Sequence, residues 1–104
     1  MNAKTTKALS GGQAAVEALR NEKTEYVFGL IGSATMEMFD ALYDANDIKF
    51  IGIHDERTGT HMADGCARAS GKTGVVLAGQ NGPGATNLVT GLAQAKAAYS
   101  PVVS

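Results

Sequence analysis

The sequence predicts an α/β fold in which helices cover both faces of a parallel sheet, and two observations carry this prediction. Short apolar segments with strand character alternate along the chain with segments of helical periodicity, in the order α-β-α-β-α-β-α-β. Such alternation joins parallel strands through right-handed helical connections. In addition, the apolar run at 74–78 does not alternate with polar residues, which is typical of a strand buried on both faces.

The first helix is predicted over residues 10–21. Ser10 and Gln13 stand three apart ahead of an apolar stripe, which is the spacing of a capping box at a helix start. Runs rich in β-branched and aromatic residues predict buried strands, and apolar residues three or four apart predict a helix. The first half of the chain therefore has three further elements: a strand at 26–31, a helix at 36–43 and a strand at 48–53.

The second half of the chain continues the alternation. A long helix is predicted at 56–70 and is stopped by a glycine and a lysine, after which the strand at 74–78 follows. Residues 79–84 contain three glycines and one proline, and this composition predicts a loop. Helical spacing returns at 85–99, and the apolar run at 101–103 begins another strand. We therefore expect the sheet to be incomplete at the C-terminus.

Composition and charge exclude several classes of protein. The 104 residues suffice for one domain, and 44% hydrophobic with 18% charged residues exclude a disordered chain. Nine basic and ten acidic residues form no basic stripe, so we expect no nucleic-acid partner. Apolar runs are far shorter than the roughly 18 residues of a membrane span, and no secretory signal is visible. A single cysteine, Cys66, suits a reducing compartment, so we expect a cytoplasmic protein.

Three loops are predicted to meet at one edge of the sheet. In three-layer folds of this kind, whether flavodoxin-like or Rossmann-like, ligands bind beyond the carboxyl ends of parallel strands. The loops that follow the first three strands occupy residues 29–34, 54–59 and 79–87. We therefore expect the functional site to be built from these three segments.

Residue types alone leave the chemistry of these loops open. The glycine-rich segment offers backbone N–H groups to an anion or a polar ring atom, or forms only a tight turn. It is neither a dinucleotide fingerprint, because Asn87 stands at the third glycine position, nor a P-loop. Glu56 is either an acid–base group at a strand end or an ordinary first-turn glutamate. His54, Glu56 and His61 match no standard metal-binding spacing, so no metal ligand is predicted.

Three motifs in these loops resemble the N-terminal, pyrimidine-binding domain of thiamine diphosphate-dependent enzymes. Residues 27–34 read VFGLIGSA and are followed by FDAL at 39–42, similar to the family pattern V-F-G-x-P-G-G-A…D-A-L. Glu56, with HMADGCARASG at 61–71, resembles E…H-x-A-D-G-Y-A-R-x-[ST]-G. NGPGATNLVTG at 81–91 resembles the S-G-P-G-A-T-N-L-V-T-G of acetolactate synthases. The resemblance covers about residues 10–103.

The resemblance implies a role for Glu56 as the catalytic residue of this domain. In the family, a carboxylate at this position hydrogen-bonds N1′ of the aminopyrimidine ring. That contact favours the imino tautomer, whose 4′-nitrogen removes the C2 proton of the thiazolium ring. The C2 carbon then attacks a 2-keto acid, and the thiazolium stores the resulting negative charge.

The resemblance also assigns the other residues of the site and the rest of the protein. The diphosphate and its Mg²⁺ are expected on a separate C-terminal domain, so that residues 1–104 form the N-terminal domain of a longer three-domain enzyme. FAD binding stays open. Subunits are expected to assemble as a homodimer or homotetramer, and the substrate is expected to be a small molecule. The 104 residues alone are expected to be inactive. Cofactor contacts besides Glu56 are expected from six residues: Gly32, Ser33, Gly82, Pro83, Gly84 and Asn87.

Departures from the family pattern bear on the reaction. Ile31 and Ser33 stand where acetolactate synthases usually carry Pro and Gly, and Gln80-Asn81 replace Thr-Ser. These departures look more like sulfoacetaldehyde acetyltransferase, which we therefore expect, with sulfoacetaldehyde as substrate. The segment at 85–91 points to the alternative, an acetolactate synthase acting on a 2-keto acid. A catalytically incompetent partner subunit and a stand-alone nucleotide-binding module are further alternatives.

Overall fold

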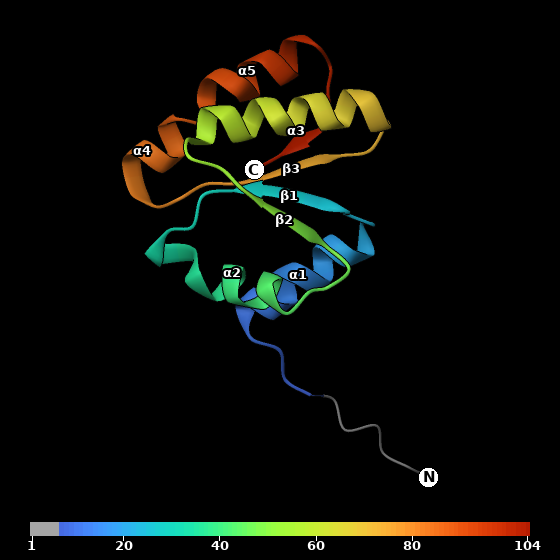
Figure 1. Cartoon of the computed structure of the whole chain (residues 1–104), viewed down its shortest axis with the longest axis vertical. Coiled ribbons are helices and arrows are strands. Elements are labelled where there is room, and N and C mark those ends of the chain that lie inside the picture. Colours follow the sequence, from blue (N-terminus) through green and yellow to red (C-terminus); the bar gives the residue numbers. More distant parts are fainter. Residues whose placement is uncertain (1–6) are drawn as a thin grey trace.

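The computed structural model describes residues 7–104 and shows a parallel sheet between two layers of helices (Figure 1). The predicted α/β class is therefore confirmed. The strand order is β2-β1-β3-β4, and all three neighbouring pairs run parallel. The strands are shorter than predicted: β1 (Tyr26–Gly29), β2 (Lys49–Gly52), β3 (Gly74–Leu77) and β4 (Val102–Val103).

The register of the three long strands brings their carboxyl ends together. Gly29, the last residue of β1, pairs with Gly52 at the end of β2 and with Leu77 at the end of β3. Hydrogen bonds continue just past these ends, from the Leu30 N–H to the Leu77 carbonyl at 3.1 Å and from the Ile53 N–H to the Gly29 carbonyl at 3.0 Å. The loops that follow the strands consequently begin side by side, as the sequence predicts.

Two helix pairs form the outer layers (Figure 1). A pair packs on each face of the sheet, and the capping box predicted at Ser10 and Gln13 begins the first helix. The other long helix begins and ends at the predicted residues, because Asp55 caps its start and Gly71, with a φ of 71°, ends it. One layer holds α1 (Gly11–Asn21) and α2 (Met36–Tyr43), and the other holds α3 (Glu56–Ser70) and α5 (Val89–Ala97).

The core is divided by the sheet into two apolar clusters. Alternate residues of β1 and β3 serve opposite faces, so Val27 and Val75 pack in one cluster while Phe28 and Val76 pack in the other. The α1–α2 cluster is completed by Val16, Phe39, Leu42, Ala45 and Ile48. The α3 side is completed by Ile53, Ala63 and Leu88. The central strands β1 and β3 are therefore packed on both faces, beneath the loops that follow them.

The segment after β3 differs from the sequence-based expectation. The predicted loop at 79–84 and helix at 85–99 are wrong in their boundaries: a short helix, α4 (Asn81–Thr86), precedes α5, and the chain bends between them. Pro83 lies in the first turn of α4, where helix N–H groups have no partner within the helix, so proline is tolerated. Tyr43 and Tyr99, at the ends of the helical patterns predicted over 36–43 and 85–99, are 87% and 95% exposed and pack in neither cluster of the core.

No helix within residues 7–104 is long and apolar enough to cross a lipid bilayer.

Candidate functional site

An open cavity of about 510 Å³ lies where the loops after β1, β2 and β3 meet. Each of the three loops contributes lining residues, so the loops meet as expected, and we take this cavity as the candidate site. Six of the seven residues singled out from the sequence line it: Gly32, Ser33, Glu56, Pro83, Gly84 and Asn87. The seventh, Gly82, is exposed and is not among the lining residues.

Glu56 is the buried charged residue of this cavity. It is the first residue of α3 and is only 4% exposed. Its Oε1 accepts a hydrogen bond from the backbone N–H of Gly79 at 3.1 Å, and its Oε2 accepts one from Nδ2 of Asn87 at 3.1 Å. Both donors are neutral, and no cation forms an ion pair with Glu56 within residues 7–104. The carboxylate is thus held in place without a counter-ion.

The neighbouring carboxylate, Asp55, is in a different environment. Its Oδ1 accepts a hydrogen bond from the Arg57 backbone N–H at 2.8 Å, and its Oδ2 pairs with the Arg57 guanidinium at 2.6 Å. The guanidinium, with a smaller contribution from the backbone N–H, lowers the pKa of Asp55 from 3.8 to about 2. Asp55 is therefore ionised at neutral pH and is engaged as the cap of α3, whereas Glu56 has no cation partner among residues 7–104.

Glycines allow the backbone to approach the Glu56 carboxylate closely. A Cβ atom on Gly79 would lie 2.9 Å from Glu56 Oε1, and one on Gly84 would lie 2.9 Å from the Gly79 carbonyl. A Cβ on Gly32 would lie 2.7 Å from the Gln80 nitrogen. A Cβ on Gly82 would meet open space. Close packing therefore explains the glycines at 32, 79 and 84, whereas it gives no reason for one at 82.

Gln80 connects two of the three loops. Its side-chain Oε1 accepts a hydrogen bond from the Ala34 backbone N–H at 3.0 Å and another from the Ser33 hydroxyl. From the sequence, Gln80 was only a departure from a family motif, and Gly79 was only part of a glycine-rich segment. The structure adds both to the site. Their signal in the sequence is their position directly after a buried strand.

The family of the chain follows from its sequence relatives. Residues 9–104 match the family described as "Thiamine pyrophosphate enzyme, N-terminal TPP binding domain". The chain belongs to this family. The resemblance drawn from the three motifs is thereby confirmed, and thiamine diphosphate is the cofactor that the family implies.

Curated relatives of this TPP-binding domain include two kinds of enzyme. The chain is 44% identical over 97 residues to the acetolactate synthase large subunit of Haemophilus influenzae, covering 93% of this chain and 17% of the relative. It is 47% identical over 96 residues to a probable acetolactate synthase large subunit of Methanococcus aeolicus (92% and 16%). It is 45% identical over 95 residues to the sulfoacetaldehyde acetyltransferase of Castellaniella defragrans (91% and 16%). The chain spans about a sixth of the length of these relatives.

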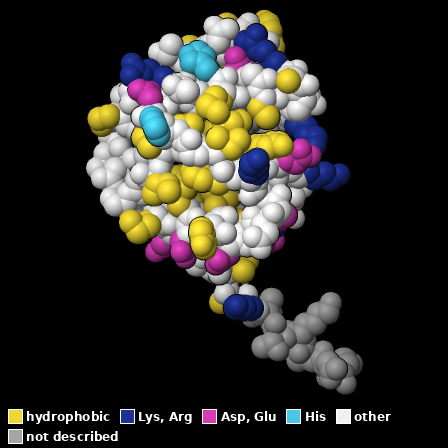
Figure 2. Space-filling model, in the orientation of Figure 1, with side chains coloured by type: hydrophobic (Ala, Val, Ile, Leu, Met, Phe, Trp, Pro, Cys, Tyr) yellow, Lys and Arg dark blue, Asp and Glu magenta, His cyan; other side chains and the backbone are white. Residues whose placement is uncertain are grey.

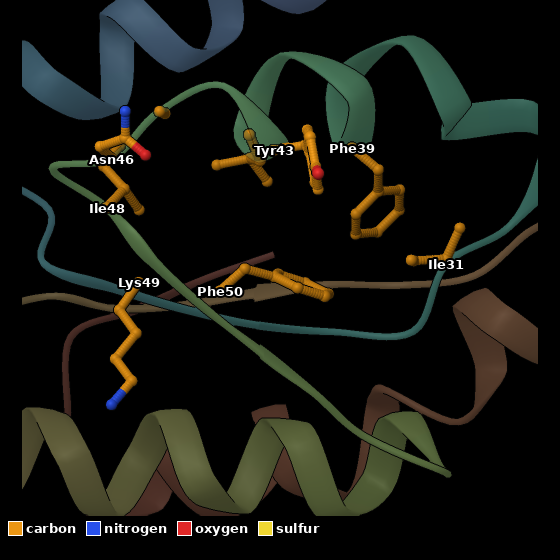
Figure 3. Close-up of a pocket in the computed structure, with 9 residues that line it drawn as sticks. Ile31, Phe39, Tyr43, Asn46, Ile48, Lys49 and Phe50 are labelled. Atoms are coloured by element: carbon orange, nitrogen blue, oxygen red, sulfur yellow. The ribbon is translucent and has the colours of Figure 1, made fainter.

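A second cavity of this TPP-binding domain lies beside the edge strand β2 (Figure 3). It measures about 560 Å³, and Phe39, Tyr43 and Phe50 contribute aromatic rings to its lining, while the Lys49 side chain extends away from them. Apolar side chains are gathered in the middle of this face of the molecule (Figure 2). Because it contains no carboxylate or histidine, this cavity lacks the acid–base groups of the Glu56 cavity.

Metal-binding residues are not grouped in the described part of the chain. Among residues 7–104, no three His, Cys, Asp or Glu side chains lie together in a way that could hold a metal ion. His54 lines the Glu56 cavity, whereas His61 is exposed on α3.

Proposed function

We propose that this chain is the pyrimidine-binding domain of a longer thiamine diphosphate-dependent enzyme, and that Glu56 is its cofactor-activating carboxylate. The observation that carries the proposal is the environment of Glu56: a buried carboxylate, held by two neutral donors, that lines an open cavity. Removing a carboxylate from water is costly unless it gains strong partners. Such a group favours a ligand atom with which it can share a proton, as a ring nitrogen of an aminopyrimidine does.

The residues around Glu56 fit a flat ring. Side chains are absent at Gly79 and Gly84, where any Cβ would crowd the carboxylate or its supporting turn. Pro83 and the backbone of Gly32 offer apolar and main-chain surface to the cavity, and His54 and Ser33 offer polar groups. When bound, the cofactor supplies a carbon nucleophile that adds to a carbonyl group and then stabilises negative charge.

This chain's own residues would then perform three tasks. Glu56 holds a proton at the ring nitrogen that faces it, and this contact sets which tautomer of the ring is favoured. Gly79 and Asn87 fix both carboxylate oxygens, so the group is oriented before the ligand arrives. Gly32, Ser33, Pro83 and Gly84 form walls of the same cavity. Gly82, which the resemblance places with them, would act only through the backbone of α4.

For the whole protein we propose an activity like that of sulfoacetaldehyde acetyltransferase. In that reaction sulfoacetaldehyde and phosphate give acetyl phosphate and sulfite, so that the carbon–sulfur bond breaks and the aldehyde carbon becomes the acyl carbon. Ser33 and Gln80 support this activity, because they depart from the acetolactate synthase motif and both line the cavity. The alternative, condensation of two pyruvate molecules to acetolactate, is supported by residues 85–91 and by relatives of that name.

The other parts of the active site would lie outside residues 1–104. Ligands for Mg²⁺ and the diphosphate would lie on another domain, and a second subunit would complete the site in a cytoplasmic homodimer or homotetramer. The 104 residues alone would then bind the cofactor weakly, because charge-assisted contacts to the diphosphate are missing.

Calorimetric titration of the complete gene product, together with an activity assay, tests the proposal. The two alternatives are a stand-alone nucleotide-binding module and a catalytically incompetent partner subunit. We expect saturable binding of thiamine diphosphate in the presence of Mg²⁺, no binding of ATP or NAD, and turnover of a carbonyl substrate. Nucleotide binding without thiamine diphosphate binding would support the module instead. Cofactor binding without turnover would indicate the incompetent subunit.

A further inference from the structure

Two loops of the site are joined by one side chain. The side-chain oxygen of Gln80 accepts hydrogen bonds from Ser33 and from the Ala34 backbone N–H, which lie 47 and 46 residues away in sequence. We call these two hydrogen bonds the Gln80 bridge. They connect the loop after β1 to the segment after β3, at the end of the sheet where α4 begins (Figure 1).

Local structure does not account for the Gln80 bridge. Gln80 stands at the N-cap position of α4, yet its side chain makes no capping hydrogen bond to that helix. The residue is exposed, and its Nε2 has no hydrogen-bond partner in the part of the chain described. Holding a long exposed side chain in one rotamer costs conformational entropy, and exposed hydrogen bonds return little stability. The bridge is therefore better explained by what it positions.

The Gln80 bridge connects the loop that carries Ser33 and Ala34 to the segment that holds the Glu56 carboxylate. The residue before Gln80 is Gly79, whose backbone N–H donates to Glu56 Oε1. On the other side of the bridge, Gly32 packs so tightly that a Cβ atom would lie 2.7 Å from the Gln80 nitrogen. Gln80 thus links the loop that carries Ser33 to the backbone that holds the Glu56 carboxylate.

We propose that Gln80 is a positioning residue for substrate selection. Through Oε1 it fixes the 32–34 loop, and that loop limits the space beside Glu56 into which a small carbonyl substrate enters. The inference rests on the proposed function and deepens it. It separates two tasks within one cavity: Gly79 and Asn87 orient Glu56 toward the cofactor, and Gln80 places the opposite wall toward the substrate.

Steady-state kinetics of the complete holoenzyme test this proposal with sulfoacetaldehyde or pyruvate, whichever the wild type turns over. Gln80→Met removes the acceptor oxygen at similar side-chain length, and Gln80→Glu keeps an oxygen acceptor but loses the NH₂ group. Gln94→Met, on the exposed surface of α5, is the matched control. We expect Gln80→Met to raise KM about tenfold while C2 proton exchange of the bound cofactor stays within threefold of wild type. We expect Gln80→Glu to raise KM less than Gln80→Met does, and Gln94→Met to keep KM within threefold.

A second variant reports on the bridge itself. Ser33→Ala removes one of the two hydrogen bonds, so KM is expected to rise less than in Gln80→Met. The double variant is expected to be no worse than Gln80→Met alone, because both changes break the same bridge. Additive losses in the double variant would contradict the proposal.

Three further results would overturn the inference. KM unchanged in Gln80→Met would show that the loop needs no bridge. Gln80→Glu as impaired as Gln80→Met would indicate that Nε2 contacts the substrate directly. A parallel loss of C2 exchange and of thermal stability in Gln80→Met and Ser33→Ala would indicate a role in folding. A wild-type enzyme without C2 exchange would overturn the proposed function itself, which distinguishes the two failures.

Discussion

Asn87 donates a hydrogen bond from Nδ2 to Oε2 of Glu56, at 3.1 Å and across 31 residues of sequence. Asn87 lies where the chain bends between α4 and α5. If residues 85–99 formed one continuous helix, as the sequence pattern alone suggests, this bend would be missing. Asn87 therefore contacts the Glu56 carboxylate from the break between the two helices.

Replacing Asn87 by leucine should destabilise the fold. The change keeps a similar volume but leaves one oxygen of the buried Glu56 carboxylate without its donor. An unsatisfied buried polar group costs about 1–3 kcal/mol, so urea denaturation of Asn87→Leu should show a loss of that order. Asn21→Leu, at the exposed end of α1, is the control. Equal stability of the two variants would mean that the hydrogen bond does not form.

Alanine at Gly84 and at Gly82 should have opposite effects. A Cβ at Gly84 would lie 2.9 Å from Gly79 backbone atoms, so we expect Gly84→Ala to lower stability and to weaken cofactor binding at least tenfold. Gly82 is helical with open space around it, so Gly82→Ala should be neutral or stabilising by about 0.5 kcal/mol. Thermal melts and cofactor titrations compare them. A loss of cofactor binding in Gly82→Ala would restore Gly82 to the site.

Acid should remove a contribution that Asp55 makes to stability. Arg57 lowers the pKa of Asp55 from 3.8 to about 2 in the folded state. Because the folded-state pKa is the lower one, the stabilisation is complete above pH 4 and is lost as the pH falls toward 2. Asp55→Asn should therefore flatten the dependence of unfolding free energy on pH between 4 and 2. Asp40→Asn, at an exposed position of α2 outside any ion pair of residues 7–104, is the control variant for the removal of one carboxylate.

The free energy of unfolding should fall by different amounts when Asp64 or Arg68 is replaced. Asp64 is buried, whereas Arg68 is exposed, pairs with it at 2.8 Å and also donates to Ser100 Oγ at 3.1 Å. Arg68→Met leaves a buried carboxylate without its cation, and Asp64→Asn leaves a cation that water can solvate. Urea denaturation should therefore show the larger loss for Arg68→Met. Equal losses would contradict a buried Asp64.

Local signals in the sequence predicted most of the fold. The bounds of α3 follow from Asp55 and Gly71, residues whose capping preferences act within a few positions. The break between α4 and α5 was missed because the apolar residues keep helical spacing through it. The four-residue spacing of Asp64 and Arg68 places them on one helix face but does not reveal that Asp64 is buried.

Only part of the candidate site could be predicted, because some of its contacts join residues that are distant in sequence. Glu56 and Asn87 stand in motifs that resemble those of a known family, so their sequence positions pointed to them as candidates. Gly79 acts through its backbone N–H, which every residue but proline has, and Gln80 through a contact with a loop 46 residues away. Neither interaction has a local sequence signature.

The central claim is that Glu56 activates the cofactor, and C2 proton exchange of thiamine diphosphate bound to the complete enzyme tests it most directly. Glu56→Gln can keep the Gly79 N–H bond through its amide oxygen, and Asn87 can offer its own oxygen after rotating its amide, so the fold should persist. Removing an acid–base group typically slows a step by about 10²–10⁴-fold, and we expect a loss of exchange rate in that range. Glu37→Gln, on the exposed surface of α2, should exchange like wild type. An exchange rate in Glu56→Gln within about threefold of wild type would contradict the assignment.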